Sequence, residues 1–145
     1  ALRSLFNGAG FKAAMQADIQ GWLRNHFIMN VAMEIEVLRS GSFKAAAASR
    51  EALVNMSHSV REMIPILKAK GSRPDAQTKL LSLFPPKLFG FIMGNLVFSP
   101  KGMPYAVVEH NHYQVGASVK EMIAEAKKRG INAPRLFAAE SLIAK

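Results

Sequence analysis

Helical periodicity is strongest in IQGWLRNHFIMNVAMEIEVLR, residues 19–39. At a period near 3.6 residues, one face of this stretch carries the apolar side chains of Ile19, Leu23, Phe27, Val31, Ile35 and Leu38. Asp18 precedes the stretch as an N-cap, and Ser40-Gly41 ends it behind a basic last turn. Other apolar residues lie off this face, and a helix that is apolar on most sides is usually buried. We therefore predict a central helix, about 30 Å long, that the other helices surround.

The composition is that of one globular domain. The chain has 145 residues, of which 50% are apolar and 20% are charged. It has no cysteine, which excludes disulfides and thiolate chemistry and fits a reducing cytoplasm, the compartment we expect. No apolar run is long enough to cross a bilayer and no signal peptide is visible, so no membrane partner is expected. The chain begins Ala1-Leu2-Arg3 rather than with Met, which we interpret as a trimmed chain or an excised domain.

The formal net charge of +9 allows a nucleic-acid partner, an anionic ligand or simple solubility. The cations are spread over several segments, and Lys127-Lys128-Arg129 is their one tight cluster. That cluster precedes Gly130, at the end of a predicted helix, where cations oppose the negative end of the helix dipole. We favour this helix-terminus interpretation, so nucleic acid is an unlikely partner.

The remaining segments also have helical patterns. Two more long helices are predicted, over residues 50–70 behind a Ser49 cap and over residues 105–129 up to Gly130. Residues 99–104, SPKGMP, form a loop. Shorter helices are expected over residues 42–48, 74–84 and 87–98, and from Pro134 onward. No strand pairs are apparent, so the predicted fold class is an all-α, multi-helix bundle with three long helices, at about 17–39, 50–70 and 105–129.

Few residues point to chemistry. His110 and His112 are two positions apart, whereas metal ligands on one helix face need a spacing of three or four, so no metal site is predicted. Gly8-Ala9-Gly10 is too short for a phosphate-binding loop. Glu34 and Glu36 also stand two positions apart, which favours two separate ion-pair partners over an acid/base couple.

Two features are more informative. Arg24 lies inside the apolar central helix, where a buried guanidinium must meet an anion or several carbonyl groups; the alternative is that it extends outward to solvent. Residues 109–114, EHNHYQ, place polar groups beside the predicted loop, as the wall of a ligand pocket or as a solvated helix face.

Three segments occur in an order that resembles a known family. Ile19, Trp22 and Arg24 open the first long helix, a basic residue and Gly71 end the second, and KRGINAP, residues 128–134, ends the third. This order is similar to that of the C-terminal helical domain of ketopantoate reductase (2-dehydropantoate 2-reductase), which is of the 6-phosphogluconate dehydrogenase C-terminal type. The resemblance covers residues 17–145. Residues 1–16 then resemble the end of an upstream Rossmann domain.

The resemblance implies the substrate-side and dimerisation domain of an NADPH-dependent oxidoreductase that reduces a 2-oxo acid or a similar carbonyl compound. The upstream domain would hold the NADPH, so this fragment alone would bind no cofactor and would be inactive. Arg24 stands at the position of the family's catalytic lysine, and arginine keeps the positive charge but is a poorer proton donor. The substrate-binding residues implied for a small anionic substrate are Ser99, Lys101, His112 and Gln114. The sequence departs from the family pattern at Ile28, where asparagine is expected, and at Gln114, where glutamate is expected.

A second hypothesis is a non-catalytic, helical protein-interaction module. Residues 88–97 are almost wholly apolar, and a helix that is apolar on all sides is either central or covered by a partner. This hypothesis predicts a homodimer through that segment.

Overall fold

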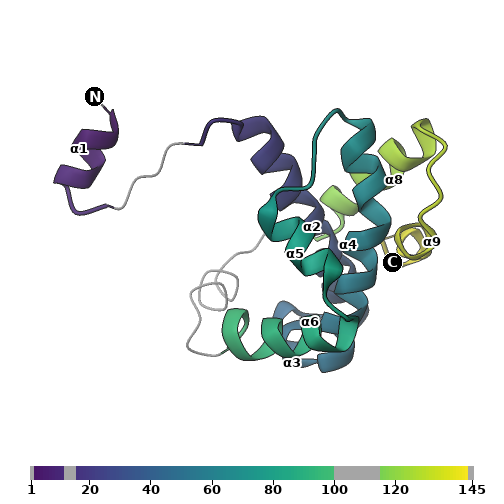
Figure 1. The fold of residues 1–145 in the computed structure, drawn as a ribbon. Helices are drawn as coiled ribbons and strands as arrows, with labels where there is room; N and C mark the ends of the chain where they lie inside the picture. Colours follow the sequence, from purple (N-terminus) through teal and green to yellow (C-terminus); the bar gives the residue numbers. More distant parts are fainter. Residues whose placement is uncertain (1, 12–15, 100–114, 144–145) are drawn as a thin grey trace.

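The computed structural model describes residues 2–11, 16–99 and 115–143. All regular secondary structure within these ranges is helical, and no strand occurs in them. In Figure 1 the two long helices, α2 (Ile19–Ser40) and α4 (Arg50–Ala69), cross at the centre of a packed bundle, and α1 (Leu2–Gly8) lies apart from it. The all-α prediction is confirmed for the described residues.

The two long helices begin and end where the sequence predicts. The Asp18 side chain accepts a hydrogen bond from Gly21 N at 2.8 Å and caps α2, and Gly41 ends α2 with φ of 80°. Ser49 caps α4 by accepting from Ala52 N at 3.2 Å. These caps satisfy backbone groups that the helix ends would leave unpaired, which fixes both boundaries.

The core lies between α2 and α4. Residues 31–37 of α2 are buried without interruption, which confirms that the helix is central. α3 (Phe43–Ala48) packs against α2, and α9 (Pro134–Ala138) packs against α4. The largest fully buried apolar side chains come from several of these helices: Phe89, Ile28, Ile35, Leu53, Met63, Ile66, Leu67 and Leu136.

Two glycines bring the next segment close to the start of α4. The apolar stretch predicted over residues 87–98 folds as α6 (Pro86–Ile92), continued by the π-helical turn η1 (Met93–Val97). A Cβ atom at Gly90 would lie 3.0 Å from Cγ2 of Val54, and one at Gly94 would lie 3.2 Å from Cδ1 of Leu53. Because neither glycine has a side chain, α6 and η1 can pack directly on α4.

The third long helix is shorter than predicted. Val115 and Gly116 form a turn, Gly116 has φ of 105°, and α8 runs over Ala117–Lys128. A continuous helix over residues 105–129 is therefore wrong, because the left-handed backbone of Gly116 cannot belong to a right-handed helix. Residues 105–114 lie outside the described ranges.

The remaining elements are short. α5 (Ala76–Leu83) is capped by Asp75, whose side chain accepts from Thr78 N at 2.7 Å. The helix predicted from Pro134 is split into α9 and α10 (Glu140–Ile143). Of the helices in the described ranges, none combines the length and the apolar character that crossing a bilayer requires.

We expect Gly90→Val to lower the free energy of unfolding by about 1–3 kcal/mol, because the added carbons would overpack against α4. Urea denaturation would measure this loss. Combining the change with Val54→Ala should recover part of it, since the nearest contact of the new side chain is Val54 Cγ2. An unchanged unfolding midpoint in Gly90→Val would contradict the close packing of α6 on α4.

Candidate functional site

Arg24 joins the start of α2 to the end of α4. Its Nη1 donates to the carbonyl oxygen of Lys70 at 3.0 Å and to the hydroxyl oxygen of Ser72 at 2.9 Å. The side chain is half-buried, so it neither stands unpaired in the core nor extends fully into solvent. Lys70 is the C-cap residue of α4, where unpaired carbonyl groups carry partial negative charge. Arg24 thus meets one carbonyl group and one hydroxyl group, an arrangement between the two alternatives for a guanidinium inside this helix.

The neighbouring Asn25 fixes the loop that follows α4. Its Nδ2 donates to the carbonyl oxygens of Gly21 at 2.8 Å and Arg73 at 3.0 Å, and its Oδ1 accepts from Asp75 N at 3.0 Å. Asn25 is only 2% exposed. Sequence reasoning missed this residue, although an asparagine within an apolar helix is a signal of a buried hydrogen-bonding role. Asn25 is the positioning residue for the loop that Arg24 contacts.

Replacing Asn25 with Asp should destabilise the protein by about 2 kcal/mol or more, because a carboxylate oxygen would then face two carbonyl oxygens. Chemical denaturation would measure the change. Asn30→Asp is the matched control, since Asn30 is exposed on the same helix. Equal effects of the two substitutions would argue against the buried network.

A hollow of about 320 Å³ opens beside Arg24. It is lined by Leu23, Arg24, His26, Phe27, Asn30, Lys70 and Glu121. Two cations, Arg24 and Lys70, therefore stand beside the apolar side chains of Leu23 and Phe27, with one carboxylate contributed by α8. This combination of charge and apolar surface fits a small organic anion.

The first turns of α2 expose apolar surface next to this hollow. Ile19 is 49% exposed, Trp22 is 41% exposed and Leu23 is 47% exposed. Trp22 stacks on His26, with ring centroids 5.2 Å apart and planes 7° apart. Large apolar side chains gathered at one end of a helix are typical of a surface that another structural unit covers.

The other predicted site residues do not join Arg24 in the described structure. Ser99 is half-buried just after η1, which packs near the start of α4, whereas Arg24 lies at the end of α4. Ser99 does not line the hollow. Lys101, His112 and Gln114 lie outside the described residues, as do His110 and the rest of the polar segment 109–114.

The two buried glutamates of α2 face different partners. Glu34 Oε1 accepts from Gly116 N at 2.6 Å, at the start of α8, while the buried Oε2 has no hydrogen-bond partner among the described residues. Glu36 Oε1 accepts from Arg39 Nη1 at 2.6 Å. The prediction of two separate ion-pair partners is confirmed for Glu36, which pairs with Arg39, whereas Glu34 forms no ion pair among the residues described.

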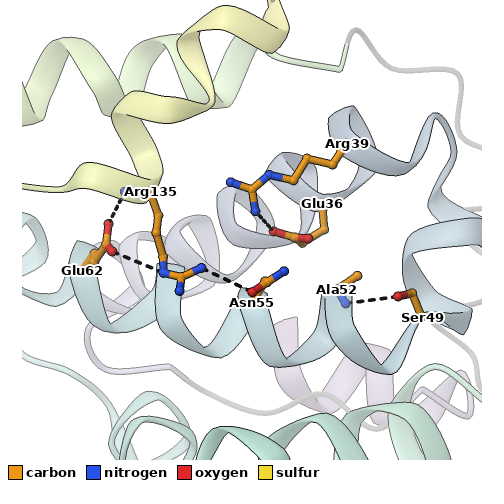
Figure 2. A network of polar contacts seen from close by, with 7 residues as sticks. All are labelled: Glu36, Arg39, Ser49, Ala52, Asn55, Glu62 and Arg135. Carbon is orange, nitrogen blue, oxygen red and sulfur yellow. Dashed lines mark hydrogen bonds and ion pairs between the residues drawn. The ribbon is translucent and has the colours of Figure 1, made fainter.

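Figure 2 shows the polar network that surrounds Glu36. Arg135 belongs to α9 and contacts two residues of α4. Its backbone N donates to Glu62 Oε2 at 2.9 Å, and its Nη1 donates to Asn55 Oδ1 at 3.3 Å. Burial raises the pKa of Glu36, although Arg39, Asn55 and Arg135 oppose the shift. Burial and the nearby cations Arg135 and Arg61 lower the pKa of His58 on α4. The network joins α2, α4 and α9. Glu36 is too deeply buried to reach a substrate.

The raised pKa of Glu36 sets the direction of a pH effect. The folded protein holds this proton more tightly than the unfolded chain, so the stabilisation is complete below the ordinary pKa of 4.5 and is lost as the pH rises through the folded-state value. The free energy of unfolding of the wild type, relative to Glu36→Gln, should therefore fall as the pH rises from about 4 to about 7. Urea denaturation across this range would measure it.

Glu125→Gln is the control with the opposite sign. The hydrogen bond from Arg129 lowers the pKa of Glu125, so its stabilisation is present above the ordinary pKa and is lost as the pH falls. Parallel pH trends for the two variants would contradict the assigned shifts.

The described residues contain neither a cluster of metal-ligating side chains nor a glycine-rich loop of the dinucleotide-binding kind. They contain no group of three or more His, Asp or Glu side chains that is arranged to hold a metal ion. Gly8 ends α1, and Gly10 follows in a turn with φ of 85°. A phosphate-binding loop lies between a strand and a helix, so these glycines do not fit a dinucleotide.

Comparisons with protein-family models, with curated proteins and with solved structures give no match to this chain. The resemblance to ketopantoate reductases therefore stays a prediction, and it rests on the order of the segments around Trp22, Gly71 and Pro134.

Proposed function

We propose that this chain is the substrate-side helical domain of a ketopantoate-reductase-like, NADPH-dependent oxidoreductase that acts on a 2-oxo acid or a similar carbonyl compound. The proposal includes a bundle of the 6-phosphogluconate dehydrogenase C-terminal type. It places the dinucleotide site in a separate domain, because the described residues here do not fit one.

The geometry around Arg24 is the observation that carries the proposal. Nη1 of Arg24 is held by the end of α4, which fixes the plane of the guanidinium group. Within the described residues, Nε and Nη2 make no hydrogen bond, so both could donate to a ligand. A pre-oriented guanidinium group is suited to binding a carboxylate through two parallel hydrogen bonds.

Lys70 and the apolar walls support the same ligand class. Lys70 lines the hollow together with Arg24, and a second cation strengthens the attraction for a carboxylate. Leu23 and Phe27 provide apolar surface for the carbon chain of a small 2-oxo acid. Arg24 would orient the substrate rather than donate a proton, because its pKa is too high for general acid catalysis.

The exposed start of α2 supports a two-domain arrangement. Ile19, Trp22 and Leu23 place apolar surface beside the hollow. A preceding domain packed against these side chains would bury them and would exclude water from the hollow. Exclusion of water strengthens the interaction between Arg24 and a carboxylate.

The test uses the polypeptide that carries this sequence together with the domain proposed to precede it. Arg24→Ala should raise KM for ketopantoate roughly 10- to 100-fold, through loss of a charge-assisted contact, while Arg24→Lys should retain most of the binding. Steady-state kinetics with NADPH would measure both variants, and circular dichroism would check their folding.

Two control variants separate binding from structure. Ser72→Ala removes one partner of Arg24 without removing the positive charge, so KM should change little. Arg73→Ala removes an exposed arginine side chain nearby. It keeps the backbone carbonyl group of residue 73, which is the group that contacts Asn25. A polypeptide that binds no NADPH in calorimetry would end the oxidoreductase proposal. NADPH binding with an unchanged KM in Arg24→Ala would instead reject only the role of Arg24.

A further inference from the structure

A second groove lies at the opposite end of α4 from Arg24. It has a volume of about 710 Å³ and is formed by one turn of α4 and one turn of α6. We call it the α4–α6 groove and define it by its lining residues: Arg50, Glu51, Val54, Lys87, Leu88 and Phe91. α4 has 20 residues, so its two ends are about 30 Å apart. The groove is therefore separate from the hollow around Arg24, and the inference drawn from it does not depend on the proposed function.

The walls of the groove are apolar and accessible. Leu88 is 43% exposed and Phe91 is 52% exposed, although both side chains are large and apolar. Val54 forms the side that belongs to α4, where the absence of a side chain at Gly90 brings the two helices together. Burial of such surface by a hydrocarbon chain would be favourable.

The rim of the groove is charged and mainly positive. The guanidinium carbon of Arg50 lies 5.8 Å from the centroid of the Phe91 ring, which holds this cation over the apolar wall. Lys87 is the second cation, and Glu51 is the one acidic group among the lining residues. An apolar wall below two cations is complementary to a molecule with a hydrocarbon chain and an anionic head group.

We propose that the α4–α6 groove binds a free long-chain carboxylate, with the hydrocarbon chain along Val54, Leu88 and Phe91 and the carboxylate between Arg50 and Lys87. A groove of this volume lies within the range of about 300–1,000 Å³ that is typical of small-molecule sites. The anion neutralises the excess positive charge of the rim.

A second copy of the chain is a poorer occupant. In a two-fold symmetric dimer the same patch meets itself, so Arg50 and Lys87 of each copy would approach the same residues of the other copy. One Glu51 from each copy would not neutralise the resulting four cations. Like charges in an interface oppose association.

Calorimetric titration of the full chain with sodium octanoate, decanoate and dodecanoate tests the proposal. The dissociation constant should fall along this series, by roughly threefold to fourfold for each added methylene. Dodecanol should bind more weakly than dodecanoate, and dodecylammonium should bind weakest of the three because the rim repels it. Equal or tighter binding of dodecylammonium would overturn the proposal.

Single substitutions locate the site. Arg50→Gln should weaken dodecanoate binding roughly fivefold to tenfold and leave dodecanol binding nearly unchanged. Glu51→Gln should tighten dodecanoate binding, because it removes the one opposing charge. Arg73→Gln, an exposed arginine outside the groove, is the matched control and should have no effect. Dodecanoate affinity that is the same in Arg50→Gln, Glu51→Gln and Arg73→Gln would place the ligand elsewhere and overturn the assignment.

Two further measurements distinguish the other possible occupants of the groove, which are a membrane surface and a second copy of the chain. Sedimentation with vesicles of phosphatidylcholine and phosphatidylglycerol detects a membrane surface, and light scattering detects a second copy. Vesicle binding that Arg50→Gln abolishes, without binding of free dodecanoate, would replace the proposal by a lipid surface. A dimer that Phe91→Glu dissociates, again without dodecanoate binding, would replace it by self-association. Dodecanoate binding to a monomer in solution supports it.

Discussion

Two carboxylates buried in the C-terminal half of α2 constrain the rest of the bundle. Glu34 and Glu36 both lie within the continuously buried residues 31–37, and an unpaired charge at such a position would be strongly destabilising. Glu34 Oε1 accepts from the backbone N–H of Gly116, the residue that directly precedes α8. Glu36 is surrounded by Arg39, by Asn55 of α4 and by Arg135 of α9. Polar contacts of one helix thus reach three other helices, and specific partners can select one arrangement among several that would bury similar apolar area.

The elements that local rules determine were predictable from the sequence. The periodic apolar residues of α2 and α4, with Asp18 and Ser49 as caps, gave boundaries that agree with the structure to within a few residues. The start of α8 was not predictable, because a glycine is tolerated inside a helical pattern and only the backbone angle of Gly116 shows that the helix begins there. The division of the apolar segment 87–98 into α6 and η1 was missed for a similar reason, since π-helical turns have no periodicity of their own in a short stretch.

The site was predictable only in part, for a different physical reason. Periodicity placed Arg24 in an apolar helix but could not identify its acceptors, because Lys70 and Ser72 are 46 and 48 residues away in the sequence. An asparagine inside an apolar helix signals a buried polar role, but the partners of Asn25 could not be identified for the same reason, because Arg73 and Asp75 come from a distant loop. Long-range hydrogen bonds of this kind depend on how the helices pack, and no local pattern encodes them. The same packing places cation-bearing hollows at both ends of α4, where positive charge meets exposed apolar surface.

The stacking of Trp22 on His26 has a practical consequence for the hollow beside Arg24. These 145 residues contain a single tryptophan, so their indole emission has one source, and that source adjoins the residues that line the hollow. A molecule that enters there, or a neighbouring domain that covers the first turns of α2, would change the surroundings of this ring. The protein therefore carries its own spectroscopic reporter at the surface where its function is proposed to lie, and no label has to be attached.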